Sequence, residues 1–105
     1  MSANNYEKVC FEIISYAGTA KSCFLEAIEL AKDGQNVSQV MEEGNKAFQE
    51  ASMTHHRALQ AETKKELDVG LLLIHAETIL SSAETIRDLS ATIIELIEKN
   101  DQVSN

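Results

Sequence analysis

The chain has 105 residues, of which 44% are hydrophobic, and this length fits one domain, residues 1–105, with a modest core. Nine Lys and Arg residues against seventeen Asp and Glu residues give a formal net charge of −8, which argues against general binding to nucleic acid or anionic lipid. The chain has no proline, four glycines and 5% aromatic residues, a composition that predicts an all-α fold.

The N-terminal residues 1–8 lack the basic and apolar regions of a signal peptide, and no apolar stretch reaches the roughly 18 residues of a membrane-spanning helix. We therefore expect a soluble, cytoplasmic protein without direct membrane insertion. Cys10 and Cys23 lie about 20 Å apart along the axis of one predicted helix, which is too far for a disulfide. Both cysteines are predicted to be free thiols.

The first helix is predicted over about residues 5–33, because its apolar residues recur with the helical period. Gly34 provides the stop signal, since glycine accepts the left-handed conformation that ends many helices. After a short turn, Asn36 and Gln39 resemble a capping box, and the second helix is predicted over about residues 36–66.

The third helix is predicted over about residues 69–99, with Asp68 as its best N-cap. Residues 100–105 have no periodic apolar content and are expected to be disordered. Together the three segments predict an antiparallel three-helix bundle.

The third helix carries two neighbouring rows of mostly apolar residues. The first row consists of Leu72, His75, Ile79, Ser82, Ile86, Leu89, Ile93 and Leu96. The second row consists of Leu73, Leu80, Ala83 and Ile94. One apolar face would suffice for a monomeric bundle, so the extra surface predicts a homo-oligomer built on this helix, and isoleucine at several positions favours trimers or tetramers over dimers.

His75 is the first candidate for chemistry, because four consecutive apolar residues, 71–74, run directly into it. Four consecutive positions cover most of a helix circumference, so we expect protein to cover this segment on nearly every side. Two interpretations of His75 follow from the pattern. The ring is either a buried histidine satisfied by hydrogen bonds, or a nucleophile or general base whose second nitrogen is held in place.

The other two histidines and the known metal and phosphotransfer motifs provide weaker indications of a functional site. His55 lies on the apolar side of the second helix and is expected to pack in the core, whereas His56 is expected to face outward. No histidine has a glutamate three residues before it, as a di-iron bundle requires, and the Cys and His clusters of zinc sites are absent from the sequence. A histidine phosphotransfer domain commonly has a Lys where this chain has Thr78. We expect no metal and no cofactor.

Residues 71–77, LLLIHAE, resemble the phosphorylation-site signature LLLVHAQDHLM of the lactose/cellobiose-type IIA component of the bacterial phosphoenolpyruvate-dependent sugar phosphotransferase system. Residues 14–22, ISYAGTAKS, resemble the first-helix pattern ISHAGNARS of the same family. The likeness spans nearly the whole chain, with both motifs in the family's order.

The resemblance implies a homotrimer of three-helix subunits that together form a nine-helix assembly. It also implies that His75 accepts a phosphoryl group from the histidine-containing phosphocarrier protein and passes it to a cysteine of the IIB component. The sugar would be a β-linked disaccharide such as cellobiose or lactose, taken up through a membrane IIC component. A mostly apolar site would protect the labile phosphohistidine from water.

Three residues after the candidate histidine depart from the family pattern, since Glu77, Thr78 and Ile79 stand where the family has Gln, Asp and His. The family's Asp contributes to a metal site on the trimer axis, and Thr78 cannot supply that charge, so no axial metal is expected. Glu77 would repel a dianionic phosphoryl group if it pointed inward, and would be harmless as an outward, solvated acid.

Two functional hypotheses follow. The first is a working phosphocarrier, a phosphotransferase component with His75 as its sole nucleophile. The alternative is a non-catalytic helical interaction or regulatory module that retains the trimer but transfers phosphoryl groups poorly.

Overall fold

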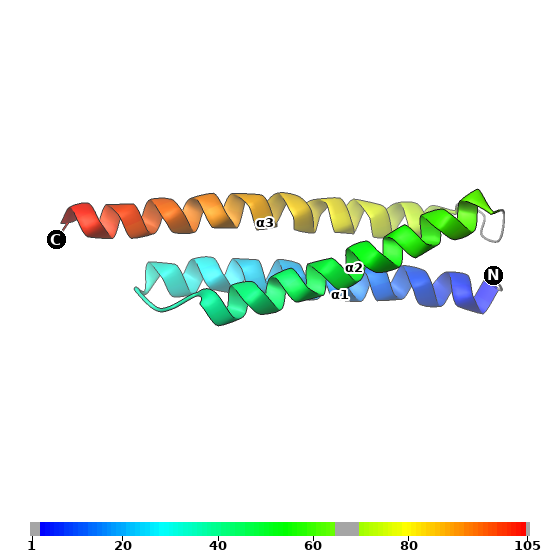
Figure 1. Cartoon of the computed structure of the whole chain (residues 1–105), viewed down its shortest axis with the longest axis horizontal. Helices are drawn as coiled ribbons and strands as arrows, with labels where there is room; N and C mark the ends of the chain where they lie inside the picture. Colours follow the sequence, from blue (N-terminus) through cyan, green and yellow to red (C-terminus); the bar gives the residue numbers. More distant parts are fainter. Residues whose placement is uncertain (1–2, 65–69, 105) are drawn as a thin grey trace.

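The structure is a computed structural model that describes residues 3–64 and 70–104, and the regular elements in these ranges are all helices. Helix α1 spans Ala3–Lys32, α2 spans Ser38–Thr63 and α3 spans Leu71–Ser104. The chain runs along α1, back along α2 and forward again along α3, so α1 and α3 are parallel to each other (Figure 1). The prediction of an all-α fold with three helices is confirmed for the described residues.

Helix α1 lies at the centre of the arrangement, because it packs along both α2 and α3, whereas these two helices contact each other little. The molecule is a narrow rod with extents of 59 × 18 × 16 Å. Helix α2 crosses α1 obliquely and comes nearest to α3 at the end of the rod where α3 begins (Figure 1). The described part of the chain therefore leaves most of the surface of α3 that turns away from α1 uncovered.

The core consists mainly of small side chains, which let the helices approach closely. Helix α1 contributes a buried stripe with the helical period: Cys10, Ile13, Ala17, Ala20, Phe24, Ala27 and Ala31. Helix α3 contributes a row that we call its inner face: Leu73, Ala76, Leu80, Ala83, Ser90 and Ile94. Gly44 of α2 packs on Phe24, since a Cβ atom at Gly44 would lie 2.7 Å from the ring carbon Cε1.

The end of α1 is a Schellman motif at Gly34, whose φ of 73° lies in the left-handed region. The Gly34 N–H donates to the Ala31 carbonyl at 3.0 Å, and the Gln35 N–H donates to the Leu30 carbonyl at 2.9 Å. These two bonds satisfy carbonyls that the helix leaves unpaired. The prediction that Gly34 stops the first helix is confirmed.

Helix α2 begins at Ser38, two residues later than predicted, and no side chain caps it from the N-cap position, Val37. The Asn36 side-chain oxygen instead accepts a hydrogen bond from the Ser38 N–H at 2.8 Å. Asn36 thus forms a local turn that satisfies one free N–H of the helix. The predicted capping box between Asn36 and Gln39 is wrong because the helix starts beyond Asn36.

The start of α3 is held by a side chain from α1. The Tyr6 hydroxyl accepts a hydrogen bond from the Leu73 N–H at 3.1 Å, and the Gly70 carbonyl accepts from the Ile74 N–H at 3.2 Å. A Cβ atom at Gly70 would lie 2.5 Å from the Tyr6 hydroxyl, so the absence of a side chain there lets the hydroxyl approach. Asp68, the predicted N-cap, lies outside the described residues.

Helix α3 continues to Ser104, so the prediction of disorder is wrong for residues 100–104. No glycine or proline follows Lys99 in the sequence, and therefore nothing in the backbone chemistry stops the helix. The Lys99 ammonium lies 3.2 Å from the Glu95 carboxylate, one turn earlier, and such pairs support an exposed helix.

Candidate functional site

His75 lies at the start of the second turn of α3, and its side chain is exposed. Of the apolar residues before it, Leu73 is buried and Leu72 half-buried, whereas Leu71 is 86% and Ile74 50% exposed. The prediction that protein covers this segment on nearly every side is therefore wrong within one chain. The segment is covered by α1 on one side and open on the other.

The imidazole of His75 makes no hydrogen bond or ion pair with any other residue in the described ranges. The interpretation of His75 as a buried, hydrogen-bonded core residue therefore does not describe this chain. Leu73 and Ala76, on either side of it, are both buried against the rest of the bundle and fix the rotation of the helix. His75 is thus an accessible ring on a firmly packed helix.

Glu77 lies two residues after His75 but projects to another side of α3. Residues two apart on a helix point about 160° away from each other. The Glu77 carboxylate Oε2 lies 3.3 Å from the Nε2 atom of His55, on α2. Glu77 therefore neither points toward His75 nor stands in solvent without a partner.

His55 and His56 have different surroundings. His55 is half-buried beside Glu77, whereas His56 is exposed on α2, as expected. The position of His55 on the apolar side of the second helix was the available sequence signal, but it indicated burial and gave no partner. Ile79, like Leu72, is half-buried and packs against the core.

The surface of α3 opposite the inner face carries His75 and no Asp, Glu, Lys or Arg. We call it the outer face, and it consists of Leu71, Ile74, His75, Thr78, Ser82, Thr85, Leu89, Thr92, Ile93 and Leu96. A quarter of the residues in this chain are charged and its formal net charge is −8, so a face without Asp, Glu, Lys or Arg stands out from the rest of the sequence. Charged side chains would oppose burial against another protein, and this face has none of them.

Three threonines recur on the outer face at intervals of seven residues. The hydroxyls of Thr78, Thr85 and Thr92 each donate back to the carbonyl four residues earlier, at 3.0, 3.1 and 3.4 Å. Because the hydroxyls are satisfied within α3, the face can be buried without leaving these donors unpaired. The Thr78 hydroxyl is neutral and already engaged, so it does not fit a site for a divalent cation.

The two cysteines do not resemble nucleophilic thiolates, and both are free thiols, as predicted. Burial raises the pKa of Cys10 above its ordinary value of 9.0, and a hydrogen bond with Tyr6 opposes this only in part. Burial also raises the pKa of Cys23, with the nearby carboxylates of Glu43 and Glu26 adding to the effect. Both groups therefore stay protonated near neutral pH.

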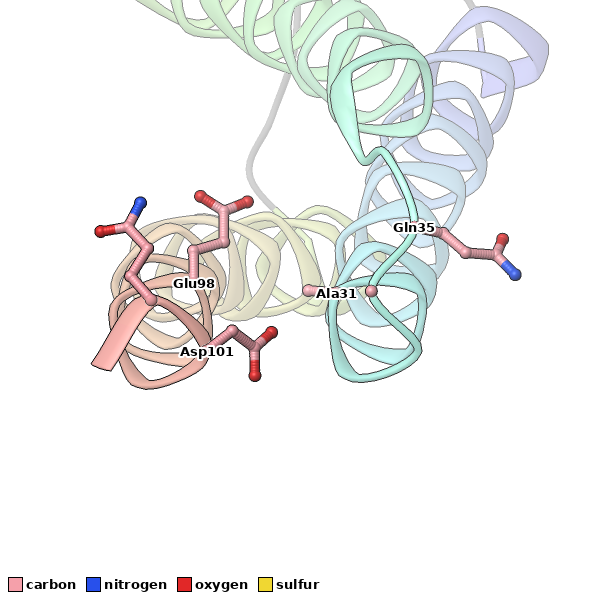
Figure 2. A pocket seen from close by; sticks show the side chains of 6 residues that line it. Ala31, Gln35, Glu98 and Asp101 are labelled. Atoms are coloured by element: carbon pink, nitrogen blue, oxygen red, sulfur yellow. The ribbon is translucent and has the colours of Figure 1, made fainter. Parts of the chain in front are cut away.

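A hollow of about 270 Å³ lies at the opposite end of the rod from His75. Its lining consists of Ala31, Gly34, Gln35, Glu98, Asp101 and Gln102. Glu98 and Asp101 come from α3, and the Gln35 side chain points away from them (Figure 2). This end of α3 is about 35 Å from His75, and the two carboxylates make the hollow unsuitable for a phosphoryl group.

Within residues 3–64 and 70–104, no three His, Cys, Asp or Glu side chains come together as a metal ion would require. No helix in the same ranges is both long enough and apolar enough to cross a membrane. The arrangement that remains is a single accessible imidazole on an uncharged helix face. An unprotonated ring nitrogen in such a place can act as a nucleophile toward phosphorus.

Comparison of the sequence with known proteins identifies a matching family. Residues 8–98 match the family described as PTS system, Lactose/Cellobiose specific IIA subunit. The chain is 36% identical over 97 residues to the lichenan-specific phosphotransferase enzyme IIA component of Bacillus subtilis, covering 89% of this chain and 87% of that protein. It is 32% identical over 102 residues to the lactose-specific EIIA component of Staphylococcus epidermidis, covering 94% and 98%.

The fold is similar to a solved structure over almost its whole length. The crystal structure of the PTS cellobiose specific enzyme IIA from Bacillus anthracis matches with a TM-score of 0.88 and 30% sequence identity. The match covers 97% of this chain and 94% of that one.

Proposed function

The chain belongs to the lactose/cellobiose-specific IIA family of the sugar phosphotransferase system, and we propose that it is a phosphocarrier with His75 as its phosphoryl acceptor. The observation that carries this proposal is the exposed imidazole of His75, which has no polar partner in residues 3–64 and 70–104 and lies within the residues that resemble the family signature. The Glu77 carboxylate, the main electrostatic objection, lies beside His55 and not beside His75.

In the proposed reaction, an unprotonated ring nitrogen of His75 attacks the phosphorus of a phosphohistidine on the histidine-containing phosphocarrier protein. One N–P bond forms while the donor's N–P bond breaks. The His75 ring releases the proton of its other nitrogen to solvent and the donor's leaving nitrogen takes one up, so the donor regains a neutral imidazole. The phosphoryl group then passes to a cysteine thiolate of a IIB component, where an S–P bond replaces the N–P bond. His75 is thereby regenerated, so the protein carries the group without net change.

The proposed assembly is a homotrimer with the outer faces of three α3 helices against one another. Its support is the uncharged outer face, on which Leu71 and Leu96 are 86% and 61% exposed in the single chain. The self-satisfied threonines would let this face close without an axial cation. Three copies would also cover the open side of the His75 segment, where exclusion of water slows hydrolysis of the phosphohistidine.

The proposed cargo is a β-linked disaccharide such as cellobiose or lactose, and the proposed place of action is the cytoplasm. The relatives named above carry lichenan, lactose and cellobiose in their names. The sugar itself would be bound by a membrane IIC component, so this chain contacts it only indirectly.

The test is to incubate the protein with phosphoenolpyruvate, the first enzyme of the system and the histidine-containing phosphocarrier protein. We expect one acid-labile phosphoryl group per chain, which His75→Ala should abolish and His56→Ala, a change at an exposed histidine of α2, should leave intact. Absence of label on the native chain, or label that persists in His75→Ala, would reject the proposal.

A further inference from the structure

His55 and Glu77 join α2 to α3 near the acceptor histidine. Their facing atoms, Nε2 and Oε2, are 3.3 Å apart, and their side chains are 21% and 39% exposed. Because α2 and α3 contact each other little, this pair is one of few direct links between them. A second link, the guanidinium of Arg87 over the Phe48 ring at 4.5 Å, lies farther along α3.

The Nε2 atom of His55 is buried and has no hydrogen-bond partner among the described residues. A buried nitrogen without a partner is costly, and Glu77 brings a carboxylate oxygen to ion-pair distance of it. The carboxylate in turn lies against the imidazole of His55, on the side of α3 away from His75. The contact thus restrains the side chains of both His55 and Glu77.

Glu77 has a long side chain whose rotamers allow the carboxylate to lie along α3 or out toward solvent. Without His55, nothing among the described contacts of Glu77 would hold its negative charge on the α2 side. A phosphorylated His75 carries a dianionic group only two residues away. Any rotamer that brings the carboxylate nearer to it would raise the free energy of phosphorylation by like-charge repulsion.

We propose that His55 is a positioning residue of the acceptor site, which holds the Glu77 carboxylate against α2 and so keeps its charge away from the phosphoryl group on His75. This inference rests on the proposed function of His75 as acceptor. His55 does not touch the reacting atoms, and its effect passes entirely through Glu77.

The experiment compares the rates at which His75 is phosphorylated by the phosphorylated carrier protein in four variants. His55→Ala removes the imidazole that faces Glu77 but leaves the Glu77 charge. We expect the phosphorylation rate of this variant to fall about fivefold, because the freed carboxylate repels the phosphoryl group. Adding Glu77→Gln to His55→Ala removes the charge as well, and the double variant should return to within about twofold of the native rate. Glu77→Gln alone should be no slower than the native protein.

The matched control is His56→Ala, which makes the same change at the neighbouring, exposed histidine and should leave the phosphorylation rate unchanged. Helix content and thermal midpoint are measured for every variant. If His55 acted only in folding, the phosphorylation rate would fall equally in the single and the double variant. Recovery of the rate in the double variant requires that the charge of Glu77 cause the loss.

Equal phosphorylation rates in His55→Ala and the double variant, whether both slow or both native, would overturn the inference. A Glu77→Gln rate far below the native one would overturn it too, because Glu77 would then serve the reaction directly. Failure of the native protein to accept any phosphoryl group would reject the proposed function and the inference together. A phosphorylated native protein with no recovery in the double variant would reject the inference alone.

Discussion

The inner and outer faces of α3 are made of similar residues but have different surroundings. On the inner face Leu73 is 1% and Ile94 6% exposed, whereas on the outer face Leu71 is 86% and Leu96 61% exposed. The inner face packs against the alanine-rich stripe of α1, and the outer face is largely exposed among the described residues. Hydrophobicity alone therefore does not decide which residues stabilise the single chain.

The difference separates two contributions to stability. Apolar burial is worth roughly 25 cal/mol per Å², so the inner face stabilises the folded chain in isolation. The exposed apolar residues of the outer face add no burial energy to the isolated chain. They can stabilise the protein only when another surface covers them. Substitutions on the two faces should accordingly change different measured quantities.

The largest effect is expected on the inner face, for Leu73→Ala. This residue is fully buried in the cluster around Cys10 and Ile13, and its truncation leaves a cavity. The free energy of unfolding should fall by about 2–5 kcal/mol. Urea denaturation followed by circular dichroism measures the change, and a loss below about 1 kcal/mol would show that the inner face is not the core of the protomer.

On the outer face, Leu96→Asp should weaken self-association by about a hundredfold, or about 3 kcal/mol, while the helix content stays native. Sedimentation velocity over a range of concentrations measures this. Glu84→Gln, at an exposed position of α3 outside both faces, is the control. Leu72→Asp and Ile79→Asp are less informative, because both residues also pack on the core. A native protein that sediments as a monomer would contradict the proposed trimer.

A smaller effect is expected from Tyr6→Phe, which removes the hydroxyl that accepts the Leu73 N–H at the start of the inner face. The loss of this bond should lower the free energy of unfolding by about 1 kcal/mol. Tyr16→Phe, at a 39% exposed tyrosine of the same helix, serves as the matched control and should have little effect. Equal changes in both variants would remove the capping role assigned to Tyr6.

The smallest effect concerns pH. Burial raises the pKa of Cys10 in the folded chain above the ordinary value of 9.0 that applies after unfolding. Above that pH the unfolded thiol has lost its proton while the folded one keeps it, so the stability contributed by the neutral thiol is present below pH 9 and lost as the pH rises. Denaturation at pH 8 and 10 should show this decline, and Cys10→Ala should reduce it. An unchanged decline in the variant would assign the effect to other groups.

Much of the fold was predictable because it depends on local chemistry. The helical period of the apolar residues located all three helices, and Gly34 marked the end of the first. The predicted start of α2 and end of α3 differ from the structure. Asn36 forms a turn before α2, and Lys99 is followed by no glycine or proline, so α3 continues to Ser104. Such ends are set by competing local bonds of similar energy.

The candidate site was predictable only in part. The sequence pointed to His75, but it also predicted a covered ring, because periodicity shows which residues share a row and not which element lies over that row. Leu72 and Ile79, assigned to an association surface, are half-buried within the protomer, whereas Leu96 of the same row is exposed. The pairing of His55 with Glu77 depends on the rotation of two helices about their axes, which no pattern within one helix records.

The hydrogen bond of the Tyr6 hydroxyl limits how far the amino terminus can be truncated. It anchors the first turn of α3 across 67 residues of sequence, through the N–H of Leu73. Trimming the amino terminus past Tyr6 would therefore loosen the distant segment that presents His75. Tyr6 and His75 therefore lie at the same end of the rod, the one at which α3 begins.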